Sequence, residues 1–390
     1  MKNRLWALVP LLLLTVVLCA QQIPLQMPRP QFSNPFYDNF SRNYVNATAA
    51  GRGYTGLATL GDSDNALLNP AAAKPDSASF YLELDIKPPI EAEGYPMYAN
   101  YTSPAPISLV GLSTNFGKDF SGALLYNVPK SITLDDFSFY INQGNDFVQR
   151  FPTYYLHRLS TNLAYHRENL HVGLNLHSEI HYYDDPIFLQ TYDRVRDYQF
   201  SFRVQPGLLY KHGPWGIGYT LLPPTKYDWD MKYAKYNMLD PLWMSGGLSY
   251  SNPGYAAHLE AEWEQTSAVD DHFDDRMIFK AGAEKIQGAL SYRLGYMYGS
   301  KVYSGYIRLP HNLAEPDTSI FWNDVPDSLY VKDSSQHALT LGLSYKHKRG
   351  SINLAAMQTI VAEVPRTQIS ISLSFYLSTF TRKKELYLND

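Results

Sequence analysis

The sequence is almost free of cysteine, since Cys19 is the only one among its 390 residues. Cys19 lies in a segment that we expect to be removed, so the remaining chain has no disulfide, cysteine metal site or cysteine nucleophile. Charged residues make up only 18% of the chain, and beyond residue 20 no apolar run reaches the ~18 residues of a transmembrane helix. Aromatic residues at 14% exclude intrinsic disorder. The lack of cysteine excludes a disulfide-rich scaffold, the lack of long apolar runs excludes a helical membrane protein, and the aromatic content excludes a disordered chain.

The first 20 residues have the pattern of an export signal. Lys2 and Arg4 precede an apolar stretch at 8–17, and Ala20 is a small residue at the cleavage position. A lipoprotein would instead keep Cys19 as its anchor, but Leu18 stands where a small residue is expected. We therefore predict a signal peptide at 1–20, whose loss changes the formal net charge from −4 to −6.

From residue 77 onward, apolar and polar residues alternate with a period of two, which predicts strands rather than helices. In the last such segment Ile369, Ile371 and Leu373 share one face, and serines share the other. The pattern predicts about 14 strands of roughly the ten residues that cross a bilayer when tilted. The predicted strands are 77–86, 106–116, 119–128, 158–167, 170–182, 197–211, 214–222, 242–251, 254–266, 277–286, 288–298, 336–347, 350–361 and 367–377.

The connections between these strands alternate between tight turns and long loops. A soluble β-sandwich shows the same apolar–polar alternation but has no reason to sort its loops, whereas bacterial outer-membrane barrels have short turns at one rim and long loops at the other. We therefore predict an all-β fold, a transmembrane antiparallel β-barrel at 77–378 with a periplasmic tail at 379–390. The predicted loops are 87–105, 129–157, 183–196, 223–241, 267–276 and 299–335, with a short closing connection at 362–366.

A barrel also explains the average composition. An apolar outer face and a polar lumen face average to the mean hydropathy of −0.30. Many of the 32 tyrosines fall near strand ends, where aromatic girdles meet the membrane interfaces. The predicted girdle residues are Tyr210, Trp215, Tyr219, Tyr250, Tyr255, Tyr298 and Tyr345.

Before the barrel, residues 21–76 read as a tether followed by a segment rich in glycine and alanine. Residues of this size allow close approach of backbones, which suits a hatch packed inside a narrow lumen. The predicted hatch residues are Gly51, Gly53, Gly56, Gly61, Asp62, Asn69, Pro70 and Ala71.

This glycine-rich stretch, followed by the acidic run that begins at Asp62 and by Asn69, Pro70 and Ala71 just before the first strand, resembles the N-terminal hatch of the FadL family. Members of that family are outer-membrane transporters of long-chain fatty acids and other hydrophobic compounds, and the related PorV and PorQ barrels of type IX secretion begin similarly. The match covers residues 49–73. The resemblance implies a hatch in the lumen and a barrel that takes up apolar ligands from outside and releases them sideways or into the periplasm.

Alternation places Arg203, Lys280 and Arg293 on the lumen face. These cations either bind a ligand carboxylate or form ion pairs that stiffen the barrel, and the second role is the commoner one. His177, Glu179 and His181 also share that face, but same-face neighbours ~6.6 Å apart are too widely spaced for one small ion, so we predict no metal site.

Acidic residues and His272 gather in the 267–276 loop, where solvated charge is more usual than a calcium, lipopolysaccharide or catalytic site. The sequence has no GxSxG, P-loop, Rossmann or HExxH motif and no clustered basic patch. It therefore predicts no enzyme, no cofactor and no nucleic-acid partner.

The sequence as a whole favours passive passage of hydrophobic or amphipathic small molecules through the bacterial outer membrane. The alternative is a PorV/PorQ-like component of a type IX secretion system, with secretion proteins as partners. Other expected partners are outer-membrane lipid, lipopolysaccharide, a hydrophobic ligand and the barrel assembly machinery. A phase change near Val110 and Gly111 predicts a bulge and a lateral weak point, with Gly122 on the next strand as a second.

Overall fold

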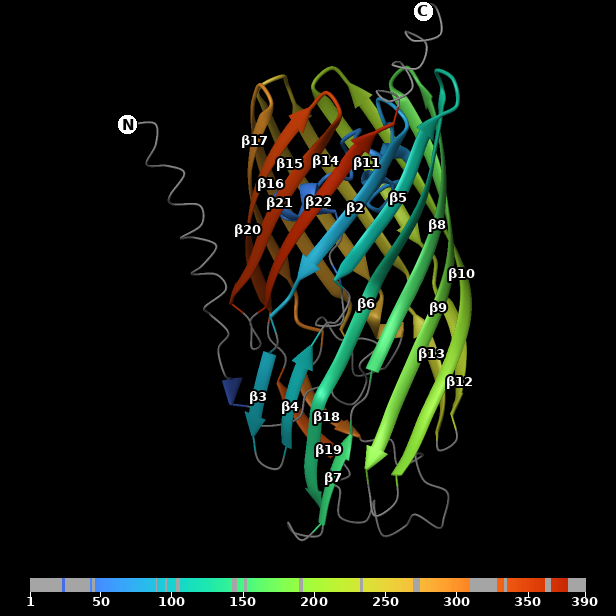
Figure 1. Cartoon of the computed structure of the whole chain (residues 1–390), viewed down its shortest axis with the longest axis vertical. Helices are drawn as coiled ribbons and strands as arrows, with labels where there is room; N and C mark the ends of the chain where they lie inside the picture. The colour runs from blue at the N-terminus through green and yellow to red at the C-terminus, as the bar shows by residue number, and fades with distance from the viewer. Residues whose placement is uncertain are drawn as a thin grey trace, which may run out of the picture.

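Fourteen strands close into an antiparallel barrel in the computed structural model (Figure 1). Each strand pairs with the next, and the last pairs back onto the first from Ser79↔Tyr376 to Ile86↔Ile369, which confirms the predicted fold class. The structure describes residues 23–24, 43, 46–88, 90–94, 97–102, 106–141, 146–150, 153–188, 192–231, 234–268, 274–302, 304–308, 328–332, 335–361 and 366–377. The barrel strands are β2 (Ser79–Ile86), β5 (Ile107–Asn115), β6 (Phe120–Ile141), β8 (Thr153–Arg167), β9 (Leu170–Phe188), β10 (Tyr192–His212), β11 (Trp215–Leu222), β14 (Trp243–Ser251), β15 (Tyr255–Glu264), β16 (Arg276–Gln287), β17 (Leu290–Gly299), β20 (Gln336–His347), β21 (Gly350–Val361) and β22 (Thr367–Tyr376).

Four strands run further than the sequence predicts. Much of the 129–157 and 183–196 segments, expected as loops, belongs to β6, β8, β9 and β10, and β9 and β10 stay paired as far as Phe188↔Tyr192. The alternation is lost there because a strand that extends beyond a membrane needs no apolar face, although its backbone ladder continues. The end of the apolar pattern therefore reports the end of the membrane belt rather than the end of the strand.

The remaining long connections also carry short strands, which lie at the long-loop end of the barrel (Figure 1). The shorter elements are β1 (Ile23–Pro24), β3 (Ile90–Gly94), β4 (Met97–Thr102), β7 (Asp146–Arg150), β12 (Thr225–Met231), β13 (Ala234–Asp240), the 3₁₀ turn η4 (Thr266–Ala268), β18 (Ser304–Arg308) and β19 (Ser328–Lys332). Within the described residues, no helix has the length and apolar character needed to cross a membrane.

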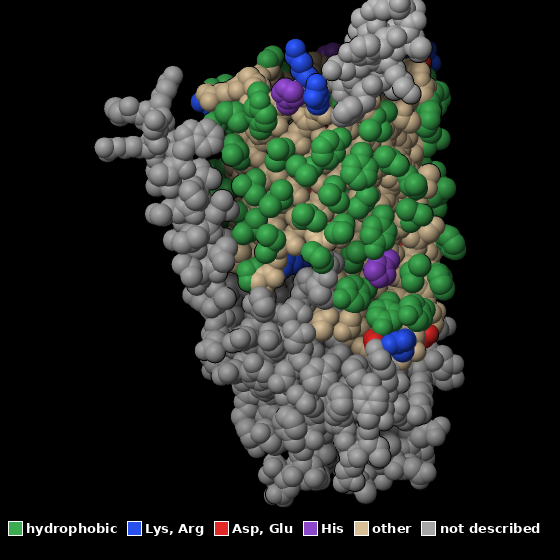
Figure 2. All heavy atoms as spheres, viewed as in Figure 1, with side chains coloured by type: hydrophobic (Ala, Val, Ile, Leu, Met, Phe, Trp, Pro, Cys, Tyr) green, Lys and Arg blue, Asp and Glu red, His purple; other side chains and the backbone are tan. Residues whose placement is uncertain are grey.

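The outer face of the wall carries a belt of exposed apolar side chains (Figure 2). At the long-loop end the belt finishes in aromatic rings, where Tyr182 and Tyr198 lie 4.9 Å apart between centroids, and then in the ion pair of Arg196 with Asp184 at 3.3 Å. From Tyr198 to Tyr210, a rise of ~3.3 Å per residue at ~40° tilt gives roughly 30 Å, the thickness of a bilayer core. All seven predicted girdle residues lie on the outward face, as expected for a barrel that spans a membrane.

One irregularity interrupts the pairing of β2 with β5. Glu83 faces Leu109 and Leu84 faces Ile107, so Ser108 is an extra residue, and both Ser108 and Leu109 point inward. The bulge predicted near residues 110–111 thus lies two residues earlier. The apparent change of phase comes from two consecutive inward side chains at the bulge itself.

Candidate ligand site in the barrel lumen

Residues 46–76, here called the inner segment, lie inside the barrel in the half nearer the short turns. The segment contains the helical turn α3 (Ala47–Ala50) and two 3₁₀ turns, η1 (Ser63–Leu67) and η2 (Pro70–Ala72). The α3 turn packs on β20, β21 and β22, whereas η2 packs on β8, β9 and β10 across the lumen. The inner segment therefore touches opposite walls.

Wall glycines make this close packing feasible. A Cβ atom on Gly295 would collide with the backbone of Gly53, and one on Gly342 would stand 2.7 Å from the Cα atom of Gly51. Gly53 also has φ +73°, a conformation that favours glycine. Sequence reasoning identified the glycines of the inner segment but missed those of the wall, whose signal is glycine at lumen-facing strand positions. The wall glycines in contact with the segment are Gly173, Gly207, Gly216, Gly218, Gly282, Gly295 and Gly342.

Two buried wall carboxylates hold the inner segment through its backbone. Glu83 on β2 accepts hydrogen bonds from the N–H groups of Asn46 at 2.8 Å and Ala47 at 2.6 Å. Glu260 on β15 accepts from the N–H groups of Gly56 at 2.5 Å and Leu57 at 2.7 Å. Each carboxyl group accepts two backbone hydrogen bonds, so these strands fix two points of the segment.

Asn69 organises the last part of the inner segment. Its side chain accepts from the N–H of Ala71 at 3.1 Å and donates to the carbonyls of Leu57 at 2.8 Å and Leu208 at 3.0 Å. Gly61 forms a parallel bridge with Ala73, and Asp62 precedes η1. All eight predicted hatch residues therefore lie in the inner segment, and their action as a hatch remains a prediction.

The three candidate ligand-binding cations are inward and buried, and each has a carboxylate partner. Arg203 pairs with Asp240 at 3.2 Å, and Lys280 pairs with Glu262. Arg293 pairs at 2.9 Å with Glu284, which also binds Arg52 at 3.2 Å. A ligand carboxylate would have to compete with these partners, so a role of the cations in ligand binding stays a prediction.

The inward histidines of β9 are engaged by neighbouring strands. His177 contacts Ser160 Oγ at 2.7 Å and the Gln205 side-chain oxygen at 2.9 Å. His181 contacts Tyr154 Oη at 3.0 Å and Ser201 Oγ at 3.1 Å. These contacts give the histidines a structural role in the lumen.

One group of potential metal ligands converges there, because atoms of Glu179, His181 and Asp240 lie within 4.8 Å of one another. However, Arg158 binds Glu179 at 2.6 Å and Arg203 binds Asp240 at 3.2 Å. Two guanidinium groups therefore hold the carboxylates that a metal would need, which favours ion pairing over metal binding.

The predicted acidic cluster of the 267–276 loop falls largely outside the described residues, including Asp270, Asp271 and His272. Asp275 is described, and it accepts hydrogen bonds from Ser267 Oγ at 2.6 Å and from the Trp263 indole N–H at 3.0 Å. These contacts give Asp275 a role in shaping the loop.

Two acidic groups of the inner segment have shifted pKa values. Burial raises the pKa of Asp64 to about 7, with the charge of Asp62 acting in the same direction and Arg52 opposing it. Burial likewise raises the pKa of Asp62. The segment thus contains a carboxyl group that titrates near neutral pH.

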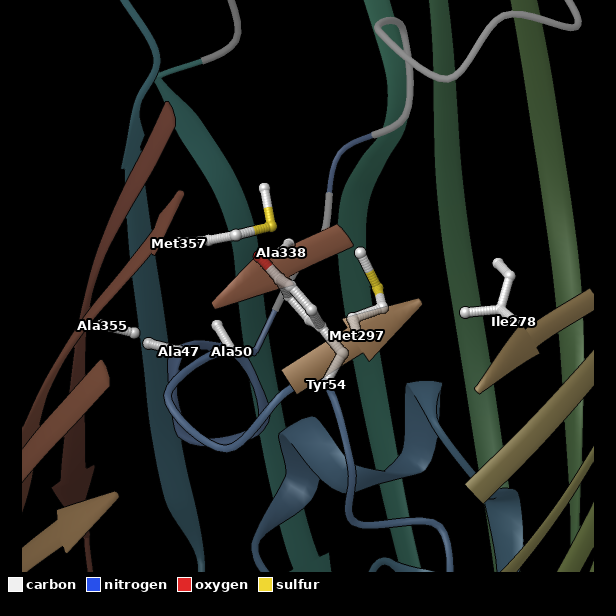
Figure 3. Close-up of a cluster of buried hydrophobic side chains, with 8 residues drawn as sticks. All are labelled: Ala47, Ala50, Tyr54, Ile278, Met297, Ala338, Ala355 and Met357. Atoms are coloured by element: carbon white, nitrogen blue, oxygen red, sulfur yellow. The ribbon is translucent and has the colours of Figure 1, made fainter. Parts of the chain in front are cut away.

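A cavity of about 210 Å³ lies beside the inner segment. Its wall is mixed, because Leu156, Leu222 and Trp243 supply apolar surface while ion-paired Arg203 and Lys280 supply charge. Tyr54 borders this cavity and also belongs to an apolar cluster that the segment forms with the barrel wall, in which it lies beside Met297 and Ala338 (Figure 3). Such a lining suits a molecule with a larger apolar part and a smaller polar one.

No protein-family model matches the sequence, and no curated protein matches it. Solved structures do resemble it. The toluene transporter TbuX of Ralstonia pickettii has a TM-score of 0.61 at 12% identity, covering 86% of this chain and 98% of TbuX. A Pseudomonas aeruginosa FadL homologue has a TM-score of 0.61 at 10% identity, covering 91% and 100%. The Pseudomonas putida toluene transporter TodX has a TM-score of 0.58 at 13% identity, covering 91% and 99%. The chain therefore has the FadL-type barrel fold, as the resemblance of residues 49–73 implied.

Proposed function

We propose that this protein lets hydrophobic or amphipathic small molecules diffuse across the bacterial outer membrane through its lumen, with the inner segment acting as a hatch. The observation that carries the proposal is the mixed apolar and charged cavity directly beside the inner segment. The apolar belt supports the location. The shared fold with two toluene transporters and a FadL homologue supports the kind of cargo.

The lining of the cavity supports a passage for molecules of mixed character. Leu156 and Leu222 offer apolar contact, and the ion pairs of Arg203 and Lys280 offer partners for a polar group. The inner segment beside the cavity is held by the hydrogen bonds that its backbone N–H groups donate to Glu83 and Glu260, and by the packing of wall glycines. A ligand would pass when these local contacts loosen, so the mechanism needs a small displacement rather than an energy source.

One observation favours the alternative of a secretion-system component related to PorV or PorQ. The β9–β10 pair continues past Tyr198 and beyond the apolar belt as far as Phe188↔Tyr192. Such an extension offers backbone and side chains to a protein partner outside the membrane. Stable co-purification of secretion proteins, together with an empty lumen, would support that alternative.

The proposal is tested by extracting lipophilic compounds from the purified protein and measuring them by mass spectrometry. Leu156→Trp fills the cavity, whereas Leu159→Trp on the same strand points outward and serves as the matched control. We expect a compound above the detergent background in the wild type and in Leu159→Trp, and less of it in Leu156→Trp. Equal amounts in all three proteins would contradict ligand binding in this cavity.

A further inference from the structure

Two buried histidines face each other across the tight turn between β8 and β9. His166 and His171 are opposite in register, one pair before Arg167↔Leu170, where the two strands meet the turn. Their Nδ1 atoms lie 3.1 Å apart, their ring centroids lie 5.1 Å apart, and each residue is only 3% exposed. We call these two residues the histidine pair. It lies at the short-turn end of the barrel, on the inward face of the wall.

The spacing of the two nitrogens matches that of two ligands of one metal ion. Nitrogen ligands ~2.0–2.1 Å from a shared ion stand roughly 2.9 Å apart at square-planar angles and roughly 3.3 Å apart at tetrahedral angles. The observed 3.1 Å falls between these two values. Neighbours on one strand, ~6.6 Å apart, are too widely spaced for such a site, whereas residues opposite each other on paired strands have Cβ atoms only ~4.5–5.5 Å apart.

Hydrogen bonds around the histidine pair set the position of the His166 proton. Ser121 Oγ donates its only hydrogen to the carbonyl of Ala73 at 2.6 Å. The 2.8 Å contact between Ser121 Oγ and His166 Nε2 is therefore donated by the imidazole N–H. A neutral imidazole has one N–H, so His166 presents the lone pair of Nδ1 to His171. This is the state that a metal ligand needs, with its other ring nitrogen donating to an acceptor.

The chemistry of the histidine pair selects among cations. Mg²⁺ and Ca²⁺ are bound by oxygen ligands, and the pair offers only nitrogen. The charged groups near the pair are Lys74 and Lys211, which repel a cation, and Asp119, which attracts one. Binding must therefore depend on bonds to the imidazole nitrogens rather than on net charge. Imidazole suits first-row transition metals, among which Cu²⁺ generally binds most tightly.

The histidine pair is connected to the end of the inner segment. Ser121 lies on β6 and joins His166 to the carbonyl of Ala73. Ala73 in turn forms the parallel bridge with Gly61, whose carbonyl accepts from the N–H of Lys74 at 2.8 Å. A metal bound at Nδ1 fixes the His166 ring, and with it the hydrogen bond that the ring makes to Ser121. Occupation of the pair would thus hold the end of the inner segment against the wall.

We infer that the histidine pair is a binding site for a first-row transition-metal cation, with Cu²⁺ the tightest, and that the bound cation fastens the inner segment to the barrel wall. Without a cation, the N–H of His171 at Nδ1 donates to His166; on binding, that proton moves to His171 Nε2 and both Nδ1 atoms become ligands. Water completes the coordination. The site is separate from Glu179, His181 and Asp240, whose carboxylates are held by arginines. It also goes beyond the proposed function, because binding requires no cargo.

The experiment measures Cu²⁺ binding to the full chain, purified without an affinity tag, by equilibrium dialysis and electron paramagnetic resonance. His171→Asn removes one of the two ligands. His212→Asn is the matched control, because His212 is also next to a short turn but its side chain is exposed. Ser121→Ala keeps both ligands and removes the acceptor that orients His166.

We expect the wild type and His212→Asn to bind one Cu²⁺ whose spectrum shows coupling to two imidazole nitrogens, and His171→Asn to lose this species. Ser121→Ala should weaken binding about tenfold, as is usual for a group that orients a metal ligand. Absence of the two-nitrogen spectrum in the wild type, or its persistence in His171→Asn, would overturn the site. If His171→Asn does not assemble, the wild-type spectrum alone decides.

Limited proteolysis then tests the connection with the inner segment. A cation that binds only the closed state suppresses opening, so Cu²⁺ at about ten times its dissociation constant should slow cleavage within 46–76 about tenfold. A chelator should restore the original rate, and His171→Asn should show no protection. An unchanged wild-type rate, or equal protection of both proteins, would overturn the fastening of the segment. Neither measurement depends on transport, so its failure is distinguishable from a failure of the proposed function.

Discussion

The carboxylate of Glu83 accepts a hydrogen bond from the backbone N–H of Ala47 at 2.6 Å, joining the first barrel strand to the first turn of the inner segment. Glu83 is fully buried, and its other oxygen lies 3.3 Å from the hydroxyl of Ser108, the extra residue of the β5 bulge. One buried carboxyl group thus connects the inner segment to the irregular part of the wall. Loosening of either element is expected to affect the other.

Glu83→Gln should loosen the start of the inner segment. The amide cannot accept with both terminal atoms, so the N–H of Asn46 or Ala47 loses its partner at a local cost of ~1–3 kcal/mol. Hydrogen exchange at these two amides should speed up, as measured by mass spectrometry on the folded barrel. Glu264→Gln is the control, because Glu264 pairs with Arg276. Unchanged exchange in Glu83→Gln would show that this carboxylate does not hold the segment.

Gly295→Ala should displace the inner segment, because the new methyl group would collide with the backbone of Gly53. Overpacking of this kind costs ~1–3 kcal/mol. Limited proteolysis should cut within 46–76 faster than in the wild type. Gly246→Ala is the control, since a Cβ there meets no atom within 4 Å. Equal proteolysis of the two variants would contradict the close packing of Gly295 on the segment.

The inner segment should be held more tightly in mild acid than at alkaline pH. Burial raises the folded-state pKa of Asp64 to about 7, above its unfolded value, so the folded state retains a proton that the unfolded segment has lost. Stability is therefore expected to fall as pH rises between about 4 and 7 and to level off above. Protease susceptibility of 46–76 across this range measures the effect. Asp64→Asn should reduce the pH dependence to the part that Asp62 contributes, and a wild-type profile that is already flat would argue against the raised pKa of Asp64.

Zinc should not bind at Glu179, His181 and Asp240, because Arg158 and Arg203 already hold the two carboxylates. Calorimetric titration with Zn²⁺ should show no saturable site in the purified His171→Asn barrel, which lacks the histidine pair. A stoichiometric site that disappears in His181→Ala would reverse this assignment.

The strands could be predicted from the sequence because a membrane-spanning wall imposes strict alternation of apolar and polar residues. β20 and β21 begin and end at the predicted residues. The outer parts of β9 and β10 could not be predicted in this way, since the apolar–polar alternation stops beyond the belt and only backbone pairing defines the strand there. The presence of a strand can thus be predicted from the local apolar–polar alternation, whereas its length depends on pairing between distant segments.

Only part of the candidate site could be predicted from the sequence. Alternation correctly places Arg203 inside the barrel, but its partner Asp240 lies in a segment expected to be a loop, 37 residues away. The contact of Gly295 with Gly53 likewise joins residues far apart in the chain. Periodicity gives the direction of a side chain, and only the closed barrel gives its partner.

The most direct test of the account is uptake of radiolabelled toluene and oleate by cells that lack the protein or express the wild type, Leu156→Trp or Leu159→Trp at equal levels. The account predicts faster uptake of at least one compound with the wild type and with outward Leu159→Trp. Uptake with the cavity-filling Leu156→Trp should fall back toward that of cells without the protein. Uptake that is the same in all four strains would contradict passage of hydrophobic molecules through this lumen.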